Sequence, residues 1–219
     1  DPSKYITFFA GSGQKVWEWN STVKGHMGCG EPGTDGTNWW SAGPDEKKDC
    51  GLYDDRLTFT KDMKYTYNPG EGGTVYVNKD SGYGTEHNPN DGNDYQVPIE
   101  GYTTDYSFEN AWNDAGIEEV YLVLPAGKNL SYIPNPEALT NPRWRFLETK
   151  TSAIKKTMSL VIDNGGIAWK YEFIPAVHVA GPEELLAGTD AAGKAWVMDS
   201  AVAGHIGCGP NADEAGGWW

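Results

Sequence analysis

Short runs of β-branched and aromatic residues, separated by Gly, Pro, Asn and Asp, dominate the pattern of apolar and polar positions in this chain. Such runs between turn residues are typical of β-strands, and helical periodicity is nearly absent. We therefore expect an all-β fold, an antiparallel β-sandwich of jelly-roll-like type. The predicted strands are Lys4–Ala10, Lys15–Trp19, Arg56–Thr60, Lys64–Asn68, Thr74–Asn78, Glu119–Leu124, Trp144–Thr149, Thr157–Ile162 and Ala168–Ile174.

Turn residues suggest how some of these strands connect. An Asn-Pro-Gly turn inside Asp62–Asn78 predicts one antiparallel hairpin, and the Asp-Asn-Gly-Gly stretch at residues 163–166 predicts another. The single helical signal is Tyr106–Gly116, where Phe108 and Trp112 lie four positions apart.

The chain also contains an internal repeat. Residues 15–40 and 194–219 align without a gap at an offset of 179, with 11 of 26 positions identical. Because the period sets the size of the repeating unit, we expect one β-sandwich module at residues 1–180. Residues 181–219 would be a linker and the truncated start of a second, homologous module.

The stretch Lys79–Thr104 is rich in Gly, Asn and Asp and almost lacks aliphatic residues. A connection of this length inside a domain is more often functional than a plain link. Its oxygen-bearing side chains at Asn90, Asp91 and Asp94 have the chemistry of a structural Ca²⁺ site. The same residue types are also ordinary in turns, so both interpretations stay open.

The charge and the chain ends narrow the class of partner. A formal net charge of −14 argues against nucleic acid and anionic membrane as partners, and leaves a neutral partner open. No apolar run is long enough to span a bilayer. The chain opens at Asp1 without a leader sequence, so we expect a mature or excised segment. No cofactor is expected beyond the possible Ca²⁺.

The three cysteines follow the repeat. Cys29 and Cys208 are equivalent positions, and Cys50 lies in the stretch that the second copy lacks. A Cys29–Cys50 disulfide would close a loop of about 20 residues, contribute about 3 kcal/mol and indicate an oxidising compartment. The alternative is that all three are unpaired small hydrophobic residues.

Motifs of known enzymes are missing. The chain has no E-x-D-x-x-E, G-x-S-x-G, H-E-x-x-H or phosphate-loop pattern. The acid pairs Asp54-Asp55 and Glu118-Glu119 are adjacent, so on a strand their side chains point to opposite faces, and we expect no catalytic residue. His26 occurs in both copies and is interpreted as fixing a glycine-rich turn by hydrogen bonds rather than as a ligand or base.

Aromatic residues give the stronger functional signal, with 10 Trp and 12 Tyr in the chain. Sugars offer flat C–H faces and a rim of hydroxyls, which suit exposed aromatic platforms flanked by polar side chains. Trp17, Trp144 and Trp169 are assigned to the core from their strand positions. The predicted carbohydrate-binding residues are Trp39, Trp40, Tyr83, Tyr95, Tyr102 and Trp112.

A family resemblance supports this interpretation. The run K-x-W-x-x-[ND]-S…G-H-[MI]-G-C-G…W-W-S-A-x-P-x-E-K…G-L-Y-D-D-x-L-T-F and the later Trp169–Pro175 segment resemble modules of Bacteroidetes surface glycan-binding proteins. Those proteins are lipoproteins with PKD-type domains encoded in polysaccharide-utilisation clusters. The matching segments are Lys15–Trp17, Gly25–Gly30, Trp39–Ala42, Glu46–Lys47 and Gly51–Phe59.

The resemblance implies a β-sandwich at the outer membrane that captures polysaccharide without cleaving it, tethered through a leader outside this chain. We therefore expect a non-catalytic module that binds a neutral polysaccharide at the cell surface, with a possible neighbouring copy that raises avidity. Two alternatives remain: a β-sandwich glycoside hydrolase or lyase with a non-standard acid pair, and a structural or adhesin repeat.

Overall fold

The computed structural model of this chain describes residues 3–84, 94–147, 157–164 and 166–176. The chain divides into two units, Asp1–Ala176 and Val177–Trp219. The second unit, with the predicted linker, repeat and Cys208, lies outside the described residues. So do Asn90 and Asp91 of the predicted Ca²⁺ site.

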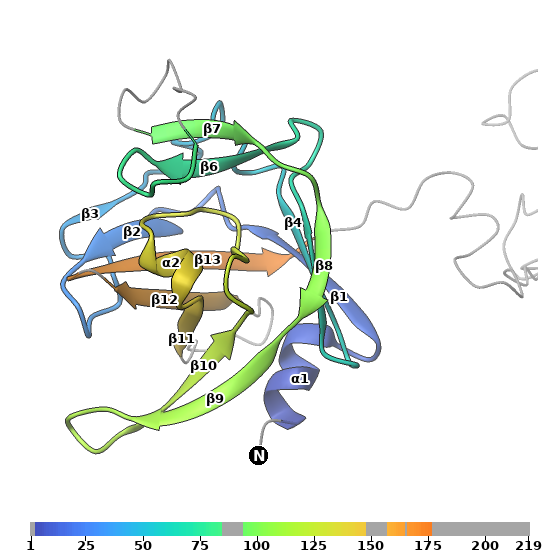
Figure 1. The fold of residues 1–219 in the computed structure, drawn as a ribbon. Coiled ribbons are helices and arrows are strands. Elements are labelled where there is room, and N and C mark those ends of the chain that lie inside the picture. Colours follow the sequence, from blue (N-terminus) through green and yellow to red (C-terminus); the bar gives the residue numbers. More distant parts are fainter. Residues whose placement is uncertain (1–2, 85–93, 148–156, 165, 177–219) are drawn as a thin grey trace, which may run out of the picture. The chain divides into compact units, whose positions relative to one another are not determined.

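Strands make up most of the regular structure in the described part of the first unit, together with two short helices (Figure 1). The strands and helices are α1 (Ser3–Ala10), β1 (Gln14–Trp19), β2 (Met27–Gly30), β3 (Trp40–Ser41), β4 (Arg56–Thr60), β5 (Lys64–Asn68), β6 (Thr74–Asn78), β7 (Asp94–Pro98), β8 (Tyr102–Asp105), β9 (Ser107–Trp112), β10 (Glu118–Val123), α2 (Glu137–Thr140), β11 (Arg143–Leu147), β12 (Met158–Asn164) and β13 (Ile167–Pro175). This confirms the expected all-β, antiparallel fold.

One curved sheet forms most of the unit. Its strand order is β8-β5-β4-β1-β13-β12-β11-β10-β9, with β2 paired to β13 and β3 paired to β2. β8 and β9 stand at opposite ends of this order, yet only Tyr106 separates them in the chain. The sheet therefore curls until its two edges meet in one long bent segment, which makes it a near-barrel (Figure 1).

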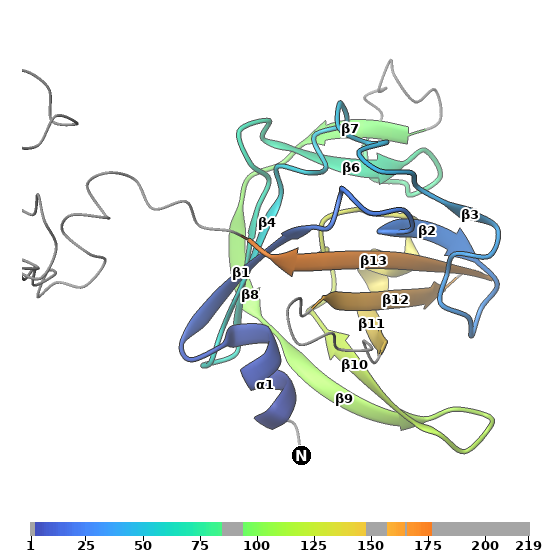
Figure 2. The same cartoon turned by 180° about the vertical axis from the view of Figure 1, so that it is seen from behind.

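The remaining two strands form a two-stranded ribbon, β6–β7, next to β2 and β3 (Figures 1 and 2). Two backbone hydrogen bonds tie it to the chain at Ile133: Asn78 N donates to Ile133 O at 2.9 Å, and Ile133 N donates to Tyr76 O at 3.1 Å. The ribbon is thereby held over the interior face of the sheet, where it forms one wall of the cleft described below.

The core inside the curved sheet is strongly aromatic, and α1 contributes to it. Phe9, Trp17, Phe59 and Tyr171 are fully buried, and the Phe9 ring lies 5.1 Å from the Phe59 ring. Such aromatic contacts add stabilisation beyond area burial, about 0.5–1.5 kcal/mol per pair. Burial of Trp17 and Trp144 confirms their assignment to the core.

The prediction of a strand at Lys4–Ala10 is wrong, because this segment is the helix α1. In a helix, residues three and four apart share a face, so Tyr5, Phe8 and Phe9 lie on one side of α1; Phe9 is in the core and Phe8 packs against it. Tyr5 and Phe8 both contact Phe146. Aromatic composition favoured a strand, but burying these rings together decides the structure.

Two further local predictions are wrong. Tyr106–Gly116 is strand β9 and a turn rather than a helix, since β9 pairs with β10 along its whole length. Asp62–Asn78 is not a hairpin, because β5 pairs with β4 and β8 whereas β6 pairs with β7. The predicted turn at residues 163–166 does join the paired strands β12 and β13.

Candidate functional site

Three side chains form a row across the adjacent strands β3, β2 and β13. Cys29 on β2 is in register with Trp40 on β3 and with Trp169 on β13. Directly opposed residues of an antiparallel pair point to the same face, so the two indoles flank the small thiol. Both indoles are half-buried and pack against the core.

These side chains line a cleft of about 320 Å³. Polar side chains of the cleft come from the β6–β7 ribbon and from the turn that follows β3. The full lining is Met27, Cys29, Trp40, Glu46, Lys47, Asn78, Asp94, Tyr132 and Trp169. An aromatic pocket with a few convergent polar groups is the usual form of a small-ligand site.

Two elements bring the polar groups to the cleft. Asn78 and Asp94 are paired residues of β6 and β7, so their side chains leave the ribbon on one face. Glu46 and Lys47 lie in the turn after β3, where Gly43 N donates a 2.5 Å hydrogen bond to the Glu46 carboxylate. Hydroxyl-bearing ligands need such donors and acceptors at the edge of an aromatic surface.

Lys47 connects the aromatic and polar parts of the cleft. Its ammonium lies 5.3 Å from the centre of the Trp40 ring and 5.6 Å from that of Tyr76. It also donates a 3.3 Å hydrogen bond to Tyr76 Oη. A buried ammonium over an aromatic face is worth roughly 0.5–2 kcal/mol, so Lys47 stabilises the orientation of the Trp40 indole.

The predicted Cys29–Cys50 disulfide is wrong, because both residues are thiols in the structure. The strand pairing explains the error. Cys29 faces the cleft between two indoles, whereas Cys50 is buried in the core with 4% exposure. Burial raises the pKa of the Cys29 thiol, so the thiol is protonated at neutral pH and is a small apolar part of the cleft floor.

The predicted carbohydrate-binding aromatic residues separate into different places. Trp40 lines the cleft, and its neighbour Trp39 is 54% exposed beside it. Trp112 is 71% exposed at the far end of the β9–β10 hairpin. Tyr83 and Tyr95 are partly buried and pack against the core.

Tyr102 has a structural environment. Its hydroxyl donates to Asn129 Oδ1 at 2.8 Å and accepts from Asn129 N at 2.9 Å. The ring also packs against Tyr65 and Tyr67. Tyr102 is therefore held inside the fold, and its predicted role as a sugar platform has no support from this placement.

The acid pairs considered for catalysis also have structural partners. Asp55 is 1% exposed and accepts hydrogen bonds from Tyr67 Oη at 3.0 Å and from Ser131 Oγ. Asp54 accepts from Gly72 N at 3.0 Å and so holds the turn before β6. A carboxyl buried as Asp55 is cannot touch a polysaccharide.

The acids of β10 are likewise engaged. Glu118 accepts a 2.7 Å hydrogen bond from Asn110, and Glu119 accepts one of 2.7 Å from Tyr121. Both lie away from the cleft of Trp40 and Trp169, at a separate hollow of about 450 Å³ lined by Tyr5, Asp35, Ile117, Glu118, Glu119, Val120, Arg145, Phe146 and Leu147.

His26 fixes its turn, as the sequence indicates. Its Nδ1 lies 2.6 Å from Val23 O and its Nε2 lies 2.7 Å from Tyr53 Oη. Burial is the largest cause of its lowered pKa. The Tyr53 hydroxyl in turn accepts a hydrogen bond from Lys47 N at 3.0 Å, so the histidine supports the turn that carries two cleft residues.

Of the predicted Ca²⁺ ligands, Asp94 is described, and it lines the cleft. Within residues 3–84, 94–147, 157–164 and 166–176, no cluster of three or more His, Cys, Asp or Glu could hold a metal ion. The Ca²⁺ site stays a prediction.

Comparison of the chain with models of known protein families and with curated proteins finds no match.

Sequence reasoning identified Trp40 but missed most of the cleft. Trp169 was assigned to the core, although it is only half-buried and forms half of the floor. Tyr132, whose ring lies 5.5 Å from that of Trp169, and Asn78 carried no signal of their own. A hint for Glu46 and Lys47 was their place in the family-like motif beside Trp40.

Proposed function

We propose that this chain is a non-catalytic carbohydrate-binding module that captures a neutral polysaccharide in the cleft of Trp40 and Trp169. The observation that carries the proposal is the row of Trp40, Cys29 and Trp169 under a polar rim. The strands that carry the two indoles, β3 and β13, lie on either side of β2, so their backbones are two strand spacings apart, about 9.6 Å. That separation is close to the length of a disaccharide.

The chemistry of the lining fits a sugar chain. Indole and phenol rings contact the C–H faces of pyranoses, and burial of that apolar area supplies most of the affinity. Asn78, Asp94, Glu46 and Lys47 line the same cleft and offer hydrogen-bond donors and acceptors to ring hydroxyls. A cleft of this size takes a short section of polymer, so a single site binds weakly and tandem sites raise avidity.

Charge supports a neutral ligand. The chain carries a formal net charge of −14, and two carboxylates line the cleft beside one ammonium. Such a field repels anionic polymers and leaves neutral ones unaffected. A β-glucan or another neutral plant or algal polymer fits these constraints.

The proposed location is the outer surface of a bacterial cell, with a lipid tether outside this chain. The support is the resemblance of Gly25–Gly30, Trp39–Ala42 and Gly51–Phe59 to modules of Bacteroidetes surface lipoproteins. In the described part of the chain, no helix is long and apolar enough to cross a membrane.

A second candidate function is glycoside hydrolysis, favoured by one observation. Glu46 and Asp94 come from different segments and line the same cleft, and two carboxylates across a sugar are the requirement for this reaction. If this candidate holds, the protein releases reducing ends from a polysaccharide, and both Glu46→Gln and Asp94→Asn abolish the release.

Affinity gel electrophoresis on a panel of polysaccharides tests the proposal. We expect a neutral polymer to retard the wild type, and Trp40→Ala to weaken binding about tenfold, since a buried aromatic anchor is worth more than about 1 kcal/mol. Trp112→Ala is the matched control, because it removes an exposed indole far along the β9–β10 hairpin. Thermal unfolding checks that both variants are folded.

Each result has a distinct meaning. Retardation that Trp112→Ala abolishes and Trp40→Ala preserves would place the site at the hairpin instead of the cleft. No retardation by any polymer would count against carbohydrate capture and favour a structural or adhesin repeat.

A further inference from the structure

The segment of residues 31–38, here called the β2–β3 loop, leads directly into Trp39 and Trp40. Most of the loop is exposed, but Gly36 is buried against the sheet. A Cβ on Gly36 would stand 3.0 Å from Lys170 N and 3.2 Å from Ala168 O, both backbone atoms of β13. A side chain would crowd this approach, and Gly36 also has a left-handed φ of +72°, so both the space and the backbone favour glycine. The loop therefore contacts the backbone of β13 shortly before Trp39 and Trp40.

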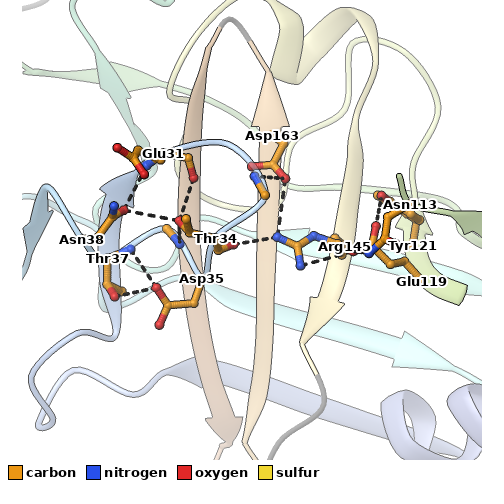
Figure 3. Close-up of polar contacts among 12 residues, drawn as sticks. Glu31, Thr34, Asp35, Thr37, Asn38, Asn113, Glu119, Tyr121, Arg145 and Asp163 are labelled. Carbon is orange, nitrogen blue, oxygen red and sulfur yellow. Dashed lines mark hydrogen bonds and ion pairs between the residues drawn. The ribbon is translucent and has the colours of Figure 1, made fainter. Parts of the chain in front are cut away.

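Arg145 of β11 holds this loop from the side (Figure 3). Its Nη2 donates a 2.6 Å hydrogen bond to Thr34 O and lies 3.5 Å from Asp163 Oδ2. The same Asp163 oxygen accepts a 3.4 Å hydrogen bond from Gly33 N. Side chains of two neighbouring strands, β11 and β12, therefore hydrogen-bond to the consecutive loop residues Thr34 and Gly33.

The opposite side of Arg145 is fixed as well (Figure 3). Its Nη1 lies 3.6 Å from Glu119 Oε1, and the guanidinium side chain is only 11% exposed. Glu119 is itself held by Tyr121 Oη at 2.7 Å and by Asn113 Nδ2 at 3.1 Å. A guanidinium with partners on both sides is a rigid anchor, because its planar fork fixes direction as well as charge.

The β2–β3 loop is stiff enough to transmit this anchorage. Thr34 Oγ1 donates to Glu31 O at 2.6 Å, and Glu31 N donates to Asn38 Oδ1 at 2.9 Å. Asp35 accepts hydrogen bonds from both the N–H and the hydroxyl of Thr37. At the end of the loop, Trp39 N donates to Cys29 O at 3.1 Å, where the floor of the cleft begins.

We propose that Arg145 is a positioning residue for the glycan site: by holding the β2–β3 loop on β13 it sets the place of the Trp40 indole in the cleft. The proposal rests on the proposed function for its effect on binding. The anchorage itself is independent of the ligand. It assigns a role to a charged cluster that neither lines the cleft nor contacts a bound sugar.

Substitution of Arg145 tests the proposal against a matched control. Arg143 stands two residues earlier on the same face of β11, but it pairs with Glu109 at 3.1 Å and covers the Tyr121 ring at 3.4 Å. We expect Arg145→Met to weaken binding of the retarding polysaccharide about tenfold, a coupling within the usual range for residues away from the ligand. Arg143→Met is expected to leave it unchanged.

Amide hydrogen exchange supplies a readout that needs no ligand. In Arg145→Met we expect faster exchange confined to residues 31–40, with the Trp39 amide included, and no such change in Arg143→Met. Arg145→Lys keeps the charge between the two acids, so it folds even if the Met variant does not. Its compact ammonium lacks the planar fork that reaches Thr34 O and both acids in the wild type, so amide exchange in the loop of Arg145→Lys should rise as well.

A double-mutant cycle decides whether Arg145 acts through Trp40. In a Trp40→Ala background, Arg145→Met should cause no further loss of affinity. An equal loss in both backgrounds, or unchanged exchange at residues 31–40, would overturn the positioning role. If the wild type binds no polysaccharide but exchange rises as expected, the proposed function fails and the anchorage stands.

Discussion

Tyr67 donates a hydrogen bond of 3.0 Å to Asp55, a carboxyl group buried at the centre of the fold with 1% exposure. The other oxygen of Asp55 accepts from Ser131 Oγ, which itself accepts a 2.9 Å hydrogen bond from Trp19 Nε1. Burial raises the pKa of Asp55 well above its usual range, more than these hydrogen bonds lower it. The second acid of the G-L-Y-D-D segment, Asp55, therefore serves the core.

The first prediction concerns the pH dependence of stability. In the unfolded chain the pKa of Asp55 is about 3.9. In the folded protein its pKa is higher, so the folded state binds more protons between the two values. The free energy of unfolding contributed by Asp55 is thus fully present below the unfolded pKa and is lost as the pH rises through the folded pKa. Urea unfolding of Asp55→Asn should show a flatter profile than the wild type above about pH 4. Parallel profiles would contradict the raised pKa.

Ser131 gives a second prediction, because its φ is +67°. Ser131→Ala loses the hydrogen bonds to Asp55 and Trp19 and keeps the strained backbone. Ser131→Gly loses the same bonds but relieves the strain. We expect the alanine variant to be less stable than the glycine variant by about 1–2 kcal/mol, the penalty for a Cβ in the left-handed region. The reverse order in urea unfolding would argue against strain at this position.

Gly36 gives a third prediction, with Gly33 as its control. Both have left-handed φ values, +72° and +79°, but a Cβ at Gly33 would meet nothing within 4 Å. Gly33→Ala should therefore cost about 1–2 kcal/mol from backbone strain alone. Gly36→Ala adds crowding against the backbone of β13 and should cost more in chemical denaturation. Equal costs would show that the loop is not pressed on the strand.

Cys29 gives a fourth prediction, because its thiol lies on the cleft floor and burial raises its pKa. Thiolate is the reactive form, so alkylation by iodoacetamide should be slow at neutral pH and accelerate only above the usual thiol pKa. A bound polysaccharide should protect Cys29, as read by peptide mass spectrometry. Cys50, 4% exposed in the core, should stay unmodified until the protein unfolds. Unprotected Cys29 in the presence of a retarding polymer would place the ligand elsewhere.

Short runs of β-branched and aromatic residues between turn residues could be predicted as strands from the sequence, and in β4 and β5 buried residues alternate with less buried ones. β4, β5 and β6 begin and end at the predicted residues. β2 could not be predicted from the sequence, since its Met-Gly-Cys-Gly sequence has the composition of a turn. Its glycines are required by distant neighbours: a Cβ on Gly28 would stand 2.8 Å from both Gly36 O and Trp40 O.

The cleft could be predicted only in part, because it too depends on contacts between residues that are distant in the sequence. Trp40 was identified by its chemistry, but its partner Trp169 is on the last strand, and only the register of β3, β2 and β13 brings them together. A sequence pattern predicts which side chains of one strand share a face, but it does not predict which strands pair. The disulfide prediction failed there too, since cysteine spacing gives loop length and not the direction of a side chain.

The central place of β13 has a consequence for how this domain is made. β13 is the last strand of the first unit, yet it pairs with β1, β2 and β12 and so completes both halves of the sheet (Figure 2). A nascent chain that has not yet exposed Ile167–Pro175 leaves β1 and β12 without their shared neighbour. Pairings between such distant segments make folding slow. We therefore expect the sheet to close only after this final strand has emerged from the ribosome, because β1, β2 and β12 all pair with it.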